Sequence, residues 1–349
     1  MSVAPESSEH LKADGRVAGL DALRVWCALW VVFGHLGFLP LTEGVDLTHL
    51  AGRISRLIYN NLTVGPAAVI VFFVISGFCI HYPFRRAKTI ALSPFYARRY
   101  LRILIPVGAA ILLSRPLGIQ LRMFDKSVLW SLVCEEIYYA IYPLLLRLRL
   151  RFGWSRMIAV SYVASVILAM TNLPAGDYPS HGFQWNWVLG LPCWLLGCHL
   201  AESHVVGIKE PSRIRIGWWR LGALFLSMLA RGMRFHTPIT YPLTLNVFAF
   251  YVYFWLREEM KNAEGSTPGW AERAGVFSYS IYLIHPTAHE VWNRLALPSL
   301  GHGVDWILLM VFVLAASLIF YVFIERPSHR FARRAHRWLR NREALAQAR

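Results

Sequence analysis

Charged residues are scarce in this chain. They make up 16% of its 349 residues, against roughly 25% in an ordinary soluble domain. Hydrophobic residues make up 56%. This composition excludes the two or three water-soluble domains that the length alone would suggest.

Cysteine is also scarce, and its five positions form no recognisable motif. All of them fall inside apolar stretches: Cys27, Cys79, Cys134, Cys193 and Cys198. Their spacing matches neither a disulfide framework nor a zinc site. We therefore expect no metal centre and treat the cysteines as small apolar side chains.

The chain lacks an internal repeat and any polar stretch long enough to form a separate domain. The missing repeat disfavours transporters built from inverted repeats. We expect a cytoplasmic arm over residues 1–17, one membrane domain over 18–325 and a basic cytoplasmic tail over 326–349. The first fifteen residues are polar, so we expect no cleavable signal peptide.

Long apolar blocks dominate the sequence instead. A helix needs about 20 mostly apolar residues to cross the roughly 30 Å of hydrocarbon in a bilayer. About ten such blocks are present, at residues 18–40, 63–83, 100–114, 128–146, 157–172, 185–202, 216–233, 240–256, 275–297 and 304–324. The predicted fold is all-α, a polytopic membrane protein with a bundle of about ten transmembrane helices.

The formal net charge of +16 is distributed unevenly. With the N-terminus placed in the cytoplasm, most arginines and lysines fall on the cytoplasmic side at each alternate loop. This positive-inside pattern predicts that both termini are cytoplasmic, in the inner membrane of a cell. Topology and contact with membrane lipids therefore explain the charge, and we expect no nucleic-acid partner.

The first apolar block contains Arg24 and His35, two residues that are costly in a membrane. Eleven helical residues make three turns plus about 20° and rise about 16 Å, so the two lie on one face. Such residues are functional candidates by default. The alternatives are a packing role for His35 and a topology anchor for Arg24, paired with Asp21.

Two further motifs contain candidate ligand-binding residues. Ser76 lies in the run Phe72–Phe78, where close helix packing is the alternative to a hydrogen bond with a thioester. Arg98, Arg99 and Arg102 lie near the start of the third block. Guanidinium groups suit bidentate contacts with phosphates, although a positive-inside loop predicts the same arginines.

Further titratable residues occur in the fourth, ninth and tenth blocks. Glu135 and Glu136 are adjacent and point about 100° apart on a helix, so at most one faces a given cavity. One of them could orient a histidine or bind a hydroxylated substrate. His285 is a second intramembrane histidine, and we expect Glu325 to pair with a loop arginine.

Several motifs, in order over residues 19–327, resemble acyltransferase family 3, membrane proteins that include bacterial glycan O-acetyltransferases. They are the Arg24-x10-His35 spacing, Phe72–Phe78, Phe95–Ile103, Trp130–Pro143, Ser278–Pro286 and Glu325–Pro327. Each is weak alone, and their order is strongly specific. This chain departs from the pattern in the neighbours of Glu135 and in a short linker between Arg102 and Trp130.

The resemblance implies a ten-helix bundle in which Arg24 and His35 are the essential pair. It also implies that acetyl-CoA or another acyl-CoA is the donor. We expect His35 to act as general base on the acceptor hydroxyl, with Arg24 and Glu135 as the other catalytic candidates. The residues expected to bind the coenzyme are Arg98, Arg99, Arg102 and Ser76.

The expected acceptor is a hydroxyl of a cell-surface or lipid-linked carbohydrate that approaches from the outer side. Tyr178, His181, Trp185 and Trp187 could contact a sugar there, although interfacial aromatic residues are expected in any case. Two alternatives stay open. One is an acyltransferase for a small secondary metabolite, and the other is a transporter or flippase with His35 as a proton relay.

Overall fold

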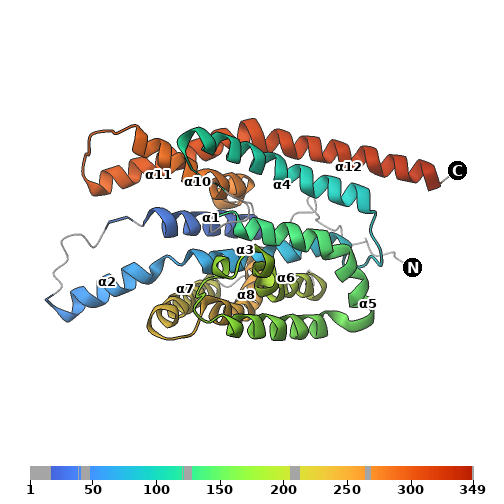
Figure 1. Cartoon of the computed structure of the whole chain (residues 1–349), viewed down its shortest axis with the longest axis horizontal. Coiled ribbons are helices and arrows are strands. Elements are labelled where there is room, and N and C mark those ends of the chain that lie inside the picture. Colours follow the sequence, from blue (N-terminus) through green and yellow to red (C-terminus); the bar gives the residue numbers. More distant parts are fainter. Residues whose placement is uncertain are drawn as a thin grey trace, which may run out of the picture.

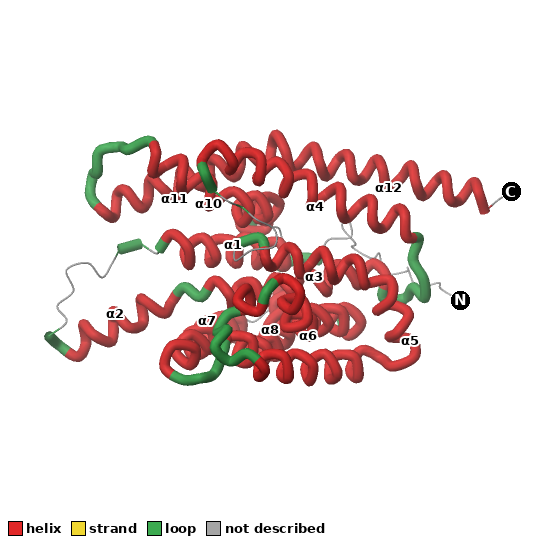
Figure 2. Tube along the Cα trace, viewed as in Figure 1, coloured by secondary structure: helices red, strands yellow, loops and turns green. Residues whose placement is uncertain are grey.

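The computed structural model describes residues 17–37, 39–40, 48–119, 121, 128–204, 213–263 and 269–347. Throughout these ranges the elements are helical and no strand occurs, as the sequence predicts. Figure 1 shows an elongated bundle, and Figure 2 shows short connections between most of its helices.

The elements follow one another as α1 (Leu20–Leu36), α2 (Leu50–Leu62), α3 (Gly65–His81), η1 (Tyr82–Phe84), α4 (Leu92–Ser114), η2 (Arg115–Leu117), α5 (Trp130–Thr171), η3 (Tyr178–His181), α6 (Phe183–Ser203), α7 (Arg213–His236), α8 (Tyr241–Ala263), α9 (Trp270–Ala274), η4 (Gly275–Phe277), α10 (Ser278–Arg294), α11 (His302–Phe320), η5 (Tyr321–Glu325) and α12 (Arg326–Gln347).

Each predicted apolar block coincides with a helix or with one limb of a helix. Gly153, with φ 72° and ψ 156°, bends α5 between the blocks at 128–146 and 157–172. Glycine adopts this left-handed φ without the steric cost of a Cβ atom. Within the described ranges, four helical stretches are long and apolar enough to cross a membrane: Leu50–Phe84, Leu92–Leu117, Trp130–Thr171 and His302–Glu343.

Helices α3 and α6 form the centre of the bundle. Thirteen of the 17 residues of α3 are buried, and 12 of the 21 residues of α6 are buried as well. A Cβ atom added to Gly77 would overlap the carbonyl of Trp194, and one added to Gly197 would overlap the carbonyl of Val74. The two glycines therefore allow the helix backbones to touch, which confirms the packing interpretation of the Phe72–Phe78 motif.

The segment predicted as a basic tail is the helix α12, which lies along α4 (Figure 1). Ser328 Oγ donates to the carbonyl of Leu101 at 2.7 Å. His336 Nδ1 lies 2.9 Å from the carbonyl of Pro94, to which it donates. These contacts place one face of α12 beside the arginines of α4.

Helix α2 is an element that the apolar blocks do not predict. It is amphipathic, and none of its thirteen residues is buried. Tyr59 donates a hydrogen bond to the carbonyl of Leu39, which ties α2 to the end of α1. In Figure 1 it extends away from the bundle at the end where α1 terminates.

Candidate functional site

A cavity of about 370 Å³ lies between α1, α3, α4, α5, α10 and α12. It brings the two ends of the chain together, because residues of α1 and α12 line the same space. Its charged lining consists of Arg24, Arg98, Arg99, Arg102 and Arg333 with Asp21, Glu135 and Glu325. Guanidinium groups outnumber carboxylates, so the cavity favours an anionic ligand.

Two of these arginines have protein partners. Arg24 Nη1 donates to Asp21 Oδ1 at 2.8 Å, and Nη2 donates to Cys79 Sγ at 3.2 Å. The predicted Asp21–Arg24 pair is therefore present. Arg102 Nε donates to His329 Nε2 at 3.1 Å. These bonds fix the guanidinium planes of Arg24 and Arg102 at the wall of the cavity.

The other three arginines of the cavity have no acceptor among the described residues. Neither hydrogen bond nor ion pair joins Arg98, Arg99 or Arg333 to any residue that the structure describes. Arg98 and Arg102 are also like-charge neighbours of Arg99. Guanidinium groups that line one cavity without a hydrogen-bonded carboxylate form a candidate anion site, since their donors are unsatisfied by protein.

The inner part of the cavity is lined by hydroxyl groups and one carboxylate. Ser76 Oγ lies 2.9 Å from Tyr139 OH and accepts a hydrogen bond from Trp194 Nε1 at 3.2 Å. Glu135 has Ser76, Tyr139 and Arg24 as its polar neighbours. The structure thus brings together four predicted residue sets: Arg24, Ser76, Glu135 and the α4 arginines.

Glu136 points away from this cavity, as the 100° separation on the helix predicts. It does not line the space, and its two carboxylate oxygens are buried without a hydrogen-bond partner among the described residues. Glu325 lines the cavity. The prediction that it pairs with a loop arginine is wrong, because its partners are Ser280 and His329. Ser280 donates to its carboxylate, and His329 Nε2 lies 3.5 Å from Glu325 Oε1.

Aromatic and hydroxyl side chains also form part of the cavity wall. Phe72 and Tyr282 both line it, and their rings meet edge to face with centroids 6.2 Å apart. The hydroxyl of Tyr282 lies 2.7 Å from Ser131 Oγ and donates to the carbonyl of Val128. These bonds fix Tyr282 in the cavity wall beside Phe72, and the two rings form an aromatic barrier there.

His35 lies beyond this barrier, in the last turn of α1. It does not line the cavity, and its side chain is exposed. Its Nδ1 lies 2.9 Å from Nε2 of His285, which is completely buried on α10. The ring of His285 in turn contacts that of Tyr282, with centroids 6.3 Å apart. Arg24 and His35 thus occupy opposite sides of Tyr282.

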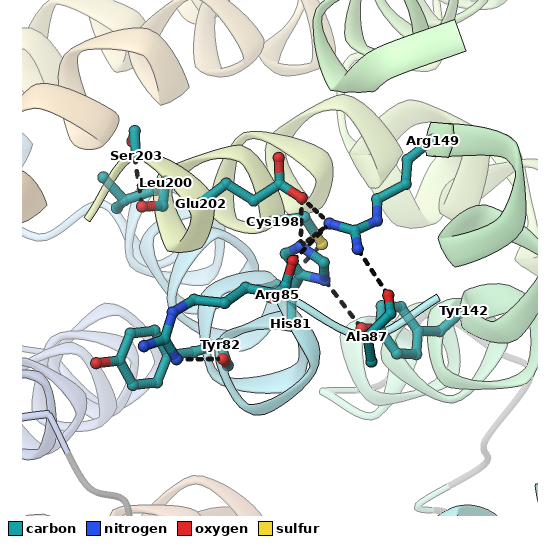
Figure 3. A network of polar contacts seen from close by, with 11 residues as sticks. His81, Tyr82, Arg85, Ala87, Tyr142, Arg149, Cys198, Leu200, Glu202 and Ser203 are labelled. Atoms are coloured by element: carbon teal, nitrogen blue, oxygen red, sulfur yellow. Dashed lines mark hydrogen bonds and ion pairs between the residues drawn. The ribbon is translucent and has the colours of Figure 1, made fainter. Parts of the chain in front are cut away.

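A second polar cluster holds the loop that precedes α4 (Figure 3). His81, completely buried at the end of α3, contacts Tyr142 OH at 2.9 Å and Glu202 Oε1 at 3.0 Å. Arg149 pairs with Glu202 and donates to the carbonyls of Arg85 at 3.0 Å and Ala87 at 2.8 Å. The cluster anchors the chain immediately before the α4 arginines.

A larger cavity of about 690 Å³ lies on the opposite face of α1. Its lining is mostly apolar and includes Trp26, Trp30 and Trp255. The one guanidinium group among its lining residues, Arg220, is bonded to both carboxylate oxygens of Glu259, at 2.7 and 3.0 Å. Among the described residues this cavity therefore offers no unpaired guanidinium group. Its buried polar atom without a hydrogen-bond partner is the amide oxygen of Asn262, which does not attract an anion.

Two of the four residues predicted to contact a sugar are part of the core. Tyr178 is buried, with its hydroxyl 3.0 Å from Asn246 Oδ1, and His181 is buried too. Burial lowers the pKa of His181. The prediction that these two residues face an outer opening is wrong, whereas Trp185 is 53% exposed.

Sequence reasoning missed the contribution of α12 to the cavity. His329, Arg333 and His336 all line it, opposite the α4 arginines. Their spacing of four and three residues is that of one helix face, so the periodicity contains the signal. Basic residues in a tail beside a membrane are usually interpreted as contacts with lipid headgroups, so a helix face that lines a cavity is easily overlooked.

Known proteins share sequence features with this chain over most of its length. Residues 17–326 match the family described as "Acyltransferase domain". One relative, Acyltransferase MdmB of Streptomyces mycarofaciens, is 24% identical over 372 residues, which cover 90% of this chain and 92% of the relative. No solved structure matches.

Proposed function

Because this chain belongs to the acyltransferase 3 family, we propose that it moves an acyl group, most simply acetyl, from cytosolic acyl-CoA to a hydroxyl of a cell-surface or lipid-linked carbohydrate. It is an enzyme that transfers acyl groups. The donor, the acceptor and the roles of individual residues below are parts of the proposal.

The proposed setting is the inner membrane, crossed ten times with both termini in the cytoplasm. The crossings are α1, α3, α4, the two limbs of α5, α6, α7, α8, α10 and α11. Two observations support the orientation. The arginines of the cavity adjoin the Arg149 cluster at one end of α3, and His35 lies at the opposite end of α1.

The observation that carries the donor assignment is the set of three unpaired guanidinium groups. Arg98 and Arg99 of α4 face the same cavity as Arg333 of α12. Coenzyme A carries several phosphate charges at one end and its thioester at the other. The phosphates would take the unsatisfied donors, and the thioester arm would extend inward past Ser76 and Glu135.

The acyl group would meet the acceptor at His35. His35 takes the proton of the acceptor hydroxyl, and that oxygen forms a bond to the thioester carbonyl carbon. The carbon–sulfur bond breaks, and the coenzyme thiolate leaves and takes up the proton. General-base assistance of this kind typically accelerates a reaction by about 10²–10⁴-fold. Arg24 holds the thioester arm inside the cavity, where its guanidinium lines the same space as Ser76 and Glu135.

Removal of the unpaired arginines tests the donor assignment. Acyl-CoA and acyl-pantetheine, which lacks the nucleotide phosphates, are compared as donors for purified protein by release of free thiol. We expect Arg99→Ala and Arg333→Ala each to raise KM for acyl-CoA about tenfold or more, since a charge-assisted bond contributes about 1.5–3 kcal/mol. The KM for acyl-pantetheine should stay unchanged.

Arg337→Ala is the matched control, because Arg337 lies on α12 and is exposed but does not line the cavity. It should behave as wild type with both donors. If the triple variant of Arg98, Arg99 and Arg333 still prefers acyl-CoA over acyl-pantetheine, this cavity is not the site that binds the phosphates.

Mass spectrometry of surface glycans tests the acceptor. Cells with wild-type protein should carry O-acyl groups that are absent from cells with His35→Ala or with no protein. An O-acyl group that persists with His35→Ala at a normal protein level would exclude His35 as the base. Acylation found only among small metabolites, or uptake without thiol release, would instead favour one of the two alternatives.

A further inference from the structure

The two histidines lie edge to edge. Their ring planes are within 8° of parallel, the ring centroids are 5.1 Å apart, and His35 Nδ1 is 2.9 Å from His285 Nε2. In two rings stacked face to face, the centroids would be about as close together as the nearest ring atoms. Here the centroids are much farther apart than the two nitrogens, so the rings lie side by side in one plane. The geometry is therefore that of one in-plane hydrogen bond between the two nitrogens.

The other nitrogen of His285 determines which nitrogen donates in this bond. His285 Nδ1 lies 2.8 Å from the carbonyl oxygen of Tyr282. A carbonyl oxygen only accepts, so Nδ1 of His285 carries a proton. In the neutral ring Nε2 then has a lone pair and no proton. His35 Nδ1 must therefore be the donor of the bond between the rings.

Pro286 explains why the Tyr282 carbonyl is available to a side chain. In a regular helix this carbonyl would accept a hydrogen bond from the backbone N–H of the residue four positions later. That residue is Pro286, which lies inside α10 and has no N–H. The His285 ring takes the place of the missing backbone donor, so the adjacent His285 and Pro286 act together.

We infer that His285 and Pro286 are positioning residues that hold His35 in the tautomer with a proton on Nδ1 and a free lone pair on Nε2. The inference rests on the proposed function, in which Nε2 of His35 takes the proton of the acceptor hydroxyl. Nε2 of His35 bonds to no residue within the described ranges, and the side chain is exposed. Nδ1 of His35 is thus held by the buried His285, while Nε2 of His35 is accessible to the acceptor.

This arrangement assigns separate tasks to the two histidines. His285 is completely buried, and both of its nitrogens are already bonded, so it does not reach a substrate. His35 alone has a nitrogen that faces outward. If His285 served only for packing, there would be no need for Pro286 to free the Tyr282 carbonyl. There would also be no need for the in-plane contact between the two rings.

Nitrogen NMR of histidine-labelled protein tests the tautomer directly. In the resting wild-type protein above the titration of His35, we expect a pyridine-type signal for Nε2 and a pyrrole-type signal for Nδ1 of His35. His285→Leu and Pro286→Ala should each give a mixture of tautomers. A pyrrole-type Nε2 of His35 in the wild-type protein would overturn the inference. This measurement needs neither donor nor acceptor, so it is independent of the proposed function.

Kinetics of the same variants supply the second measurement. His285→Leu should lower kcat about 10²-fold or more, since a wrong tautomer disables a general base, while KM for acyl-CoA stays within about twofold. His285→Gln places an amide oxygen near the position of Nε2 and should restore most of kcat. Equal losses in the Leu and Gln variants with intact folding would contradict a positioning role.

His289→Leu is the matched control on the same helix. His289 lies one turn beyond His285 and makes no hydrogen bond to the described residues. It should leave both the NMR signals of His35 and kcat unchanged. If the tautomer is as expected but His35→Ala keeps full activity, the proposed role of His35 as general base fails while the assignment of the pair stands.

Discussion

Arg24 and His35 lie on one face of α1 but on opposite sides of the Tyr282 ring. Arg24 lines the cationic cavity, whereas His35 contacts His285 outside it. Tyr282 contacts the cavity on one side and His285 on the other. Under the proposed function, a thioester held in the cavity has to pass Phe72 and Tyr282 before it reaches the histidine.

The barrier should set the length of acyl chain that is transferred. Phe72→Ala removes the ring that meets Tyr282 and should raise kcat/KM for acyl groups longer than acetyl by about tenfold or more relative to acetyl. Kinetics with a series of acyl-CoA donors measure this ratio. Phe225→Ala, at an exposed position away from the cavity, is the control. An unchanged chain-length profile would show that the acyl group takes another path.

The adjacent glutamates should respond differently to the same substitution. Glu135→Leu should abolish acyl transfer, because Glu135 lines the cavity beside Arg24 and Ser76. Glu136→Leu should leave activity intact and stabilise the protein by about 1–3 kcal/mol, since it removes buried polar atoms that have no partner. Thermal unfolding in detergent and thiol release measure the two effects. Inactivity of a well-folded Glu136→Leu protein would contradict the assignment.

The Arg149 cluster should control the order of the loop before α4. Arg149→Ala removes the donors to the carbonyls of Arg85 and Ala87, so local opening should require less free energy. Trypsin should then cleave after Arg85 or Arg86 about tenfold faster or more. Mass spectrometry identifies the cleavage positions. Arg147→Ala is the control, because Arg147 is exposed and lies within one helical turn of Arg149. Trypsin should cleave this variant at the wild-type rate.

The contact between α3 and α6 should not tolerate a single methyl group. Gly77→Ala and Gly197→Ala each place a Cβ atom against a backbone carbonyl, which cannot rotate away, so each should destabilise the protein by about 3 kcal/mol. Gly108→Ala is the control, because its Cβ atom would meet nothing within 4 Å. Thermal unfolding of the three variants tests the difference. Equal stability of all three would mean that the two helices can move apart.

The sequence alone determined most of the secondary structure and part of the site. Hydrocarbon thickness requires long apolar helices, so the blocks were visible without tertiary information. Helical periodicity placed Arg24 and His35 on one face and separated Glu135 from Glu136. The ordered motifs identified the family, which residues 17–326 confirm.

The tertiary structure alone decided which helix faces meet. Periodicity assigns a residue to a face but does not specify the helix that packs against that face. The pair of His35 and His285 joins residues 250 positions apart, and Arg333 reaches the α4 arginines only because α12 lies along α4. Interior and lipid-facing positions are similarly apolar in a membrane protein, so packing and hydrogen bonds rather than hydrophobicity select the partners.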